Sequence, residues 1–454
     1  MPVNPADGAV LGALYGTDAM RAAMGEDAFL QRMLDVEAAL ARAQARLGVI
    51  PAEAAGAITE AASDASRLDR AEMAAATRNT GYPVVALVKQ LTALAGPEAG
   101  RWTHWGATTQ DIMDTAVVLQ VRDGLTLIEA DLRATCAALA RMAAAHRDTV
   151  MAGRTHLQHA LPVTFGYKVA VWLSPLLASL DALPRVRERA LRLSFGGAAG
   201  TLASLGAQGL DVSRELAAEL DLAEADIPWH VARDGLNEAT CWLGILCGNL
   251  SKIATDVMLM SQTEYGEVSE PHVFGRGGSS TMPQKRNPIA CEYVLSQSRG
   301  VHALVPQMLG AMAQDLERGT GPWQAELLAL PQAFLLGHGA LSQARFIAEG
   351  LVVDAARMRA NLDATGGLIV SEAVMMGLAP VLGRMDAHHV VNDACDAVRD
   401  TGVSLTEALL GDARLAGKLD AAAIARMTDP AGYLGSAGAF TDRVLARAAG
   451  MGIS

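Results

Sequence analysis

The sequence is poor in aromatic residues and in positive charge, and the shortage of positive charge narrows the possible partners. Phe, Trp and Tyr make up 4% of the 454 residues. Lys and Arg number 37 against 49 Asp and Glu, which gives a formal net charge of −12. Nucleic acids and anionic membranes attract an excess of positive charge, so we expect neither as a partner. A small anionic substrate stays compatible with this composition, because it senses only the local field of its pocket.

Cysteine is also scarce, and its spacing points to no known framework. The 5 cysteines form no CxxC pair, and no histidines stand at zinc-site spacing. We therefore expect no disulfide framework, no metal site, and the reducing environment of the cytoplasm. The first residues, MPVNPADGAV, lack the regions of a secretory signal. No uninterrupted apolar run reaches the roughly 18 residues of a membrane span, so none is predicted.

Long helical periodicity is what the sequence has in abundance. Apolar residues recur at spacings of three and four over residues 29–47, 121–142 and 236–260. This spacing lines them along one helix face, as in helices that pack side by side in a bundle. Hydrophobic residues make up 51% of the chain, enough for a large core. We predict an all-α protein with an N-terminal helical domain over 1–110, a central long-helix bundle over 111–364, and a small helical domain over 365–454.

Two short polar stretches interrupt the helical pattern. GATTQD, at residues 106–111, places hydroxyl and amide groups just before a predicted helix, although its Thr and Asp are equally typical of helix caps. GRTHLQH, at residues 153–159, contains His156, which titrates near neutrality and is suited to acid–base chemistry. A histidine at the start of a helix is also commonly a cap or a packed polar group. Both interpretations stay open for each stretch.

The most unusual stretch is GRGGSSTMPQKRNP at residues 275–288. It contains neither the GxxxxGK[ST] pattern of a phosphate-binding P-loop nor the GxSxG pattern of an esterase. Its glycines allow a mobile backbone, and hydroxyls, Lys285 and Asn287 follow them. This composition suits a loop that closes over an anion, and it equally suits a solvated flexible loop.

Together, in this order and spacing, the three stretches resemble the signature regions of the fumarase/aspartase superfamily. GSSTMPQKRNP is similar to the superfamily pattern GSSxMPxKxNP, GRTHLQHALP to the second region, and GATTQDIMDTA to the first. LDVEAALARAQARLGVIP and ERGTGPWQAELLALP resemble the branch of 3-carboxy-cis,cis-muconate cycloisomerase. The resemblance spans nearly the whole chain. It implies a three-domain all-α fold and a homotetramer with a core of about twenty helices, whose active sites combine regions from three subunits.

The resemblance also implies anti β-elimination through an aci-carboxylate dianion, or the reverse addition. Ser279 matches the general base, His156 the acid that protonates the leaving group, and Glu292 the carboxylate partner of that histidine. No cofactor and no metal are implied. The positions that match or resemble substrate-binding residues are Thr108, Thr109, Thr155, Gln158, Lys285, Asn287, Arg318 and Arg21. The last two could equally be surface or interface arginines.

The match leaves the small di- or tricarboxylate substrate open. Cycloisomerases of the superfamily usually carry another residue in place of His156 and lack the glutamate at 292, which favours a lyase that releases fumarate from a substituted succinate. In adenylosuccinate lyase an N-terminal histidine pair is present, whereas the comparable stretch here reads TGYPVV. A 3-carboxymuconate cycloisomerase is the second hypothesis. A non-catalytic structural protein, as the lens crystallins of this superfamily are, is the third.

Overall fold

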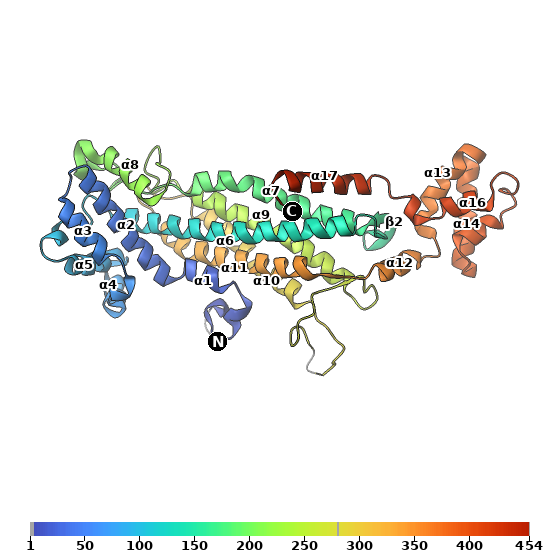
Figure 1. Cartoon of the computed structure of the whole chain (residues 1–454), viewed down its shortest axis with the longest axis horizontal. Helices are drawn as coiled ribbons and strands as arrows, with labels where there is room; N and C mark the ends of the chain where they lie inside the picture. Colours follow the sequence, from blue (N-terminus) through green and yellow to red (C-terminus); the bar gives the residue numbers. More distant parts are fainter. Residues whose placement is uncertain (1–3, 279–280, 454) are drawn as a thin grey trace. The chain divides into compact units, whose positions relative to one another are not determined.

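The computed structural model describes residues 4–278 and 281–453, and its regular structure is almost entirely α-helical (Figure 1). The part of the chain described contains 17 α-helices and four short strands. The all-α prediction is confirmed. Short 3-10 helices occupy Pro5–Asp7, Leu11–Leu14, Ala65–Arg67, Ala99–Trp102, Ala203–Gln208, Leu368–Val370 and Pro430–Gly432.

The chain divides into two compact units, and each unit is assembled from three separate stretches of sequence. The first comprises Met1–Asp131, Ser179–Leu250 and Tyr293–Ser342. The second comprises Leu132–Ala178, Ser251–Glu292 and Gln343–Ser454. The division into three consecutive domains stays a prediction.

Five helices of the described chain are longer than 20 residues and have residues in both units. Two of the stretches with periodic apolar residues lie within these helices: residues 121–142 lie in one helix and residues 236–260 in another. They are α6 (Thr109–Ala145), α7 (Phe165–Ala190), α9 (Asp234–Met260), α10 (Ile289–Gly310) and α11 (Pro322–Gly350).

Shorter helices complete the first unit: α1 (Asp18–Met24), α2 (Glu26–Arg46), α3 (Ala52–Ala61), α4 (Arg70–Thr80), α5 (Val84–Ala95) and α8 (Gly209–Leu220). Helix α2 ends two residues before Gly48, which has φ of 70°, a left-handed value that glycine adopts readily.

Close contacts hold the long helices together within the first unit. The indole nitrogen of Trp242 on α9 donates to the carbonyl oxygen of Ser179 on α7 at 3.0 Å. On α6, a β-carbon at Gly124 would lie 2.6 Å from the ring of Phe334 on α11. Glycine is therefore needed here, because it lets the two helices approach closely.

The second unit carries the strands and the C-terminal helices. Strands β1 (Val150–Thr155) and β2 (Gln158–Thr164) form an antiparallel hairpin, and β3 (Val268–Ser269) pairs with β4 (Val352–Val353). The helices are α12 (Ala355–Asp363), α13 (Ser371–Leu382), α14 (Arg384–Thr401), α15 (Leu405–Leu410), α16 (Ala421–Met427) and α17 (Ala437–Gly450). Ala152 of β1 belongs to the apolar core that Val370, Leu378 and Val390 build among these helices, so the base of the hairpin is seated on that core.

Among the described residues, two helices, α7 and α9, are long and apolar enough to cross a membrane by length and composition, and the bent helical segments over 355–363 and 368–382 would be a third if they counted as one span. The prediction of no membrane span considered uninterrupted apolar runs alone. In these two helices, isolated polar residues break the runs without lowering the average hydropathy much. In the apolar windows of these helices, 56% and 50% of the residues are buried within the fold. Much of their apolar character is therefore explained by packing against other helices.

Candidate active site

The first signature stretch is fixed through the backbone at the start of α6. The carboxylate of Asp111 accepts a hydrogen bond from the backbone nitrogen of Thr108 at 2.9 Å, so Asp111 caps this helix, as one of the two interpretations held. The hydroxyl of Thr108 accepts a bond from Nη1 of Arg318 at 3.2 Å. Nη2 of Arg318 donates to the carbonyl oxygen of Ala198 at 3.0 Å. Two predicted site residues thus meet beside the glycine-rich segment 196–200.

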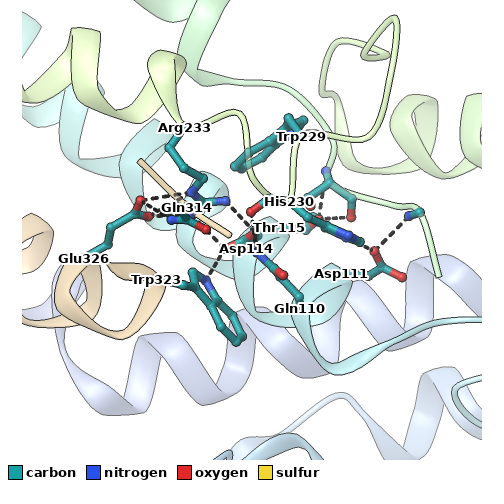
Figure 2. Close-up of polar contacts among 12 residues, drawn as sticks. Gln110, Asp111, Asp114, Thr115, Trp229, His230, Arg233, Gln314, Trp323 and Glu326 are labelled. Carbon is teal, nitrogen blue, oxygen red and sulfur yellow. Dashed lines mark hydrogen bonds and ion pairs between the residues drawn. The ribbon is translucent and has the colours of Figure 1, made fainter. Parts of the chain in front are cut away.

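Asp111 is the centre of this arrangement. It is fully buried, and besides Thr108 it accepts bonds from the backbone nitrogens of Gly196 at 2.8 Å and Gly197 at 2.9 Å. Nε2 of His230 lies 2.7 Å from Oδ1 of Asp111, the oxygen that also accepts from Gly196 (Figure 2). Four donors from three segments surround one buried carboxylate and fix the geometry of these segments, because each would lose a charged acceptor if it moved.

One turn further along α6 lies a buried charge cluster, which Figure 2 shows: Arg233 stands between Asp114 and Glu326. Nη1 and Nη2 of Arg233 donate to the two oxygens of Asp114 at 2.6 and 3.1 Å, and its Nε donates to Glu326 at 3.0 Å. The indole nitrogen of Trp323 also donates to Asp114, at 2.9 Å. The side chains of Arg233 and Asp114 are 1% and 2% exposed, so neither charge is solvated.

The charges of this cluster depend on one another. Burial raises the pKa of Glu326 despite its bonds to Arg233. Burial lowers the pKa of Arg233, but Asp114 and Glu326 outweigh it and raise the pKa. Sequence reasoning missed the cluster. The spacing of Asp111 and Asp114 places both on one face of α6, but nothing in the sequence shows that Arg233 and Glu326 lie opposite them.

Arg21 binds backbone carbonyl groups of the described residues. Its guanidinium donates to the carbonyl oxygens of Ala6, Gly12 and Tyr15. These bonds hold the N-terminal 3-10 turns against α1. A part for Arg21 in substrate binding stays a prediction.

The second signature stretch forms the tip of the β1–β2 hairpin and not the start of a helix. The helix begins only at Phe165. Thr155 pairs with Gln158, so His156 and Leu157 are the two central residues of the turn. All four side chains of this tip are exposed, and Leu157 is 67% exposed. The threonine, histidine and glutamine predicted to act on substrate are therefore presented together, away from the core beneath them.

The backbone of this turn is strained. His156 has φ of 51° and Leu157 has φ of 63°. A two-residue hairpin turn with both central residues at positive φ favours Asn-Gly, and a residue with a β-carbon resists this conformation by roughly 1–2 kcal/mol. Neither residue here is glycine or asparagine. Such strain is typical of functional positions that the surrounding structure holds in place.

The third signature stretch is described on both sides of its serines, and Ser279 lies outside the described residues. Lys285 is exposed and Asn287 is half-buried, with the backbone nitrogen of Asn287 donating to the carbonyl oxygen of Gly277 at 2.9 Å. Glu292 is exposed in the first turn of α10. Glu270 caps that helix, because its carboxylate accepts from the backbone nitrogens of Ala290 and Cys291.

The predicted site residues therefore fall into two groups. Thr108, Thr109, Arg318 and Arg21 belong to the first unit, whereas Thr155, His156, Gln158, Lys285, Asn287 and Glu292 belong to the second. Within the described ranges, no hydrogen bond or ion pair joins His156 to Glu292. Among the described residues, a side-chain hydrogen bond joins Thr108 to Arg318, and Thr155 pairs with Gln158 across the hairpin.

Comparison with known proteins places these features in a family context. A family model described as lyase matches residues 14–302, and one described as adenylosuccinate lyase C-terminus matches residues 367–444. The 3-carboxy-cis,cis-muconate cycloisomerase of Bradyrhizobium diazoefficiens is 46% identical, over 96% of this chain and 97% of its own. The nitrosuccinate lyase of Streptomyces davaonensis is 42% identical, over 97% and 94%. A crystal structure of a fumarate lyase from Mesorhizobium sp. BNC1 is 49% identical, with a TM-score of 0.88 over 95% of this chain and 98% of that one.

Proposed function

Because the chain belongs to the lyase family of the fumarase/aspartase superfamily, we propose that it performs anti β-elimination on a small carboxylate substrate. A proton next to a carboxylate is only weakly acidic. The dianion that its removal creates must be stabilised by cations and hydrogen-bond donors already in position. The substrate that we favour is a substituted succinate, which releases its leaving group and gives fumarate.

In this proposal Ser279 removes the proton. A serine is a poor base unless nearby donors and positive charge stabilise its alkoxide. Lys285 and Asn287, six and eight residues further along the chain, bind the carboxylate on which the negative charge develops. One supplies a point charge and the other an amide donor.

Thr108, Thr109 and Arg318 hold the other end of the substrate. The contact of Arg318 with the Thr108 hydroxyl supports this assignment, because a guanidinium and a hydroxyl that converge on one point suit a carboxylate oxygen. Thr155 and Gln158, exposed at the hairpin tip, contribute further hydrogen bonds. Arg21 is the remaining member of the proposed set.

The observation that carries the choice of β-elimination is His156 at the exposed hairpin tip. An amine or alkoxide leaving group needs a proton as it departs, and an imidazole in this position supplies one. Glu292 is the proposed partner that orients the imidazole and favours its charged form. The addition of a carboxylate to a double bond, as in lactone formation, expels no amine or alkoxide, so it needs no acid for a leaving group, and the proton that it takes up is delivered to carbon.

We propose that the protein is a cytoplasmic homotetramer whose active sites combine residues from three subunits. Large apolar side chains on the bundle helices support assembly: Ile245 on α9 is 65% exposed, Leu309 on α10 is 47% exposed, and Leu328 on α11 is 63% exposed. Exposed apolar side chains along packed helices are typical of surfaces that another copy covers.

The second candidate is 3-carboxy-cis,cis-muconate cycloisomerase. The cycloisomerase relative is more similar in sequence than the nitrosuccinate lyase, and this favours the lactone-forming reaction. Relatives with different activities lie within a few per cent of one another in identity, so a direct assay is needed to choose between the two candidates.

One assay compares the two candidates. The purified protein is incubated with succinates that carry amine, thioether, nitro or alkoxide substituents, and the ultraviolet absorbance of fumarate is followed. In parallel, 3-carboxymuconate is supplied and the loss of its diene absorbance is followed. Fumarate release with at least one succinate supports the preferred reaction. Turnover of 3-carboxymuconate alone would replace it with the cycloisomerase, and no turnover of any compound would favour a non-catalytic role.

A further inference from the structure

The strained turn at His156 and Leu157 needs a restraint, because both residues resist the left-handed backbone that the hairpin imposes on them. The side chains at the tip are exposed and so cannot supply it by packing. The residues directly below the tip are therefore the place to look for the restraint.

We propose that the ion pair of Arg154 with Glu267 is this restraint, and that Arg154 is a positioning residue for His156. The inference rests on the proposed function, because it assigns a task to the acid of that reaction. Nη2 of Arg154 donates to Oε1 of Glu267 at 2.7 Å, and Nη1 donates to Oε2 at 3.0 Å. This two-pronged geometry fixes the orientation of the guanidinium as well as its distance.

The environment of the pair makes it strong. The side chain of Glu267 is 0% exposed and that of Arg154 is 16% exposed, so each charge depends on the other for solvation. The guanidinium also lies over the ring of Tyr265, 4.8 Å from its centroid. Arg154 is thus held from two sides, two residues before the catalytic histidine.

Glu267 is itself firmly anchored. Nδ2 of Asn361 on α12 donates to Oε1 of Glu267 at 3.0 Å and to the carbonyl oxygen of Tyr265 at 2.8 Å. The backbone nitrogen of Asp354 donates to the carbonyl oxygen of Glu267 at 3.0 Å, next to the β3–β4 pairing. Glu267 also begins the segment that leads into the signature loop at 275–288. The ion pair therefore connects the hairpin that carries His156 to the segment that precedes the loop at 275–288.

The register of the hairpin shows what the restraint achieves. Arg154 pairs with His159, and the pairing is irregular between Ala152 and Arg154. A shift of one residue at this irregularity would turn His156 to the opposite face of the hairpin. By fixing the last strand residues before the turn, Arg154 sets both the register and the direction in which the imidazole points.

The test compares Arg154→Lys with a matched control. Lysine keeps the charge but cannot bridge both carboxylate oxygens. The control is Arg147→Lys, because Arg147 forms a similar two-pronged pair with Asp442, with both distances 2.7 Å, in the same unit and ahead of the hairpin. Glu267→Gln, which is nearly isosteric, repeats the test should Arg154→Lys fail to fold.

Two readouts are measured on the full-length protein. Amide hydrogen exchange over residues 152–161 needs no substrate, and we expect it to become about tenfold faster in Arg154→Lys and to stay unchanged in Arg147→Lys. With a substrate that has a poor leaving group, kcat should fall by about tenfold at nearly constant KM, and by less with a good leaving group.

Adding Leu157→Gly to Arg154→Lys should restore part of the lost kcat, because glycine adopts the turn without strain. A purely structural role would instead lower the melting temperature without altering the dependence on the leaving group. Unchanged exchange at the tip in both Arg154→Lys and Glu267→Gln would overturn the inference. If the wild-type protein turns over no carboxylate, the proposed function fails, while the exchange measurement still decides whether Arg154 restrains the turn.

Discussion

Thr108 and His156 are predicted to bind and protonate the same substrate, yet the chain supports them in opposite ways. The backbone of Thr108 is held by the buried carboxylate of Asp111, which accepts four hydrogen bonds. His156 stands at an exposed turn whose backbone conformation a histidine resists. The first region gains rigidity from buried polar contacts within its own unit. The second has little packing of its own, so a single ion pair beneath it has a large influence on its position.

This difference predicts how the two regions respond to substitution. A change beneath Thr108 alters a buried network and should appear first in stability. A change at the hairpin tip leaves the core untouched and should appear first in catalysis. The four predictions below test or refine this contrast, in order of decreasing effect.

Ser279→Ala should have the largest effect on the rate, because it removes the proposed base on which both regions depend. We expect kcat to fall by about 10³-fold or more with every substrate, while the melting temperature and the oligomeric state stay unchanged. Steady-state kinetics, thermal denaturation and size-exclusion chromatography measure these three quantities. A variant that keeps more than about a tenth of its rate is incompatible with Ser279 as the base.

Arg233→Met tests the buried network beneath the first region. The substitution leaves the buried carboxylates Asp114 and Glu326 without their common partner, and we expect a loss of about 3–5 kcal/mol in the free energy of unfolding. Arg46→Met is the matched control, because Arg46 also binds two carboxylates, Glu215 and Glu219, but with its side chain 45% exposed. It should cost less than about 1 kcal/mol. Equal losses in urea denaturation would contradict the contrast between buried and exposed support.

His156→Asn tests the exposed tip. Asparagine tolerates the left-handed backbone, so the melting temperature should not fall. The rate with poor leaving groups should decrease by about a hundredfold, because no acid protonates them, and the rate with good leaving groups should decrease much less. Rates plotted against the pKa of the leaving group measure this difference. A uniform decrease across the series would remove the acid role from His156.

His104→Gln is the smallest change, and it probes the part of the first unit that precedes Thr108. Nδ1 of His104 lies 2.6 Å from the buried carboxylate of Glu37. Burial lowers the pKa of His104, but the charge and hydrogen bond of Glu37 outweigh it, so the pKa is raised. The pair should contribute about 1.5 kcal/mol in acid.

The sign of the pH dependence follows from the raised pKa. The stabilisation is fully present below the unfolded value of about 6.5 and is lost as the pH rises through the higher folded pKa. The stability difference between wild type and His104→Gln, measured by urea denaturation from pH 5 to pH 9, should therefore shrink with rising pH. A constant difference would show that the pKa of His104 is the same in the folded and the unfolded protein.

Periodicity and signature motifs were enough to predict the all-α class, the course of the long helices and the family. These features are local or repeated along the chain, so they can be recognised without knowing which segments contact one another. The end of α2 is a local feature of this kind, because the left-handed Gly48 just after it stops the helix.

Which segments meet was decided only by the tertiary structure. No local pattern pairs Asp114 with Arg233 or Arg154 with Glu267, since their partners lie more than a hundred residues away. The hairpin at His156 was missed for a related reason: His-Leu is a poor turn sequence, and the fold holds it through contacts with distant residues. Local sequence sets conformational preferences, whereas buried charges and strained turns depend on long-range contacts that outweigh those preferences.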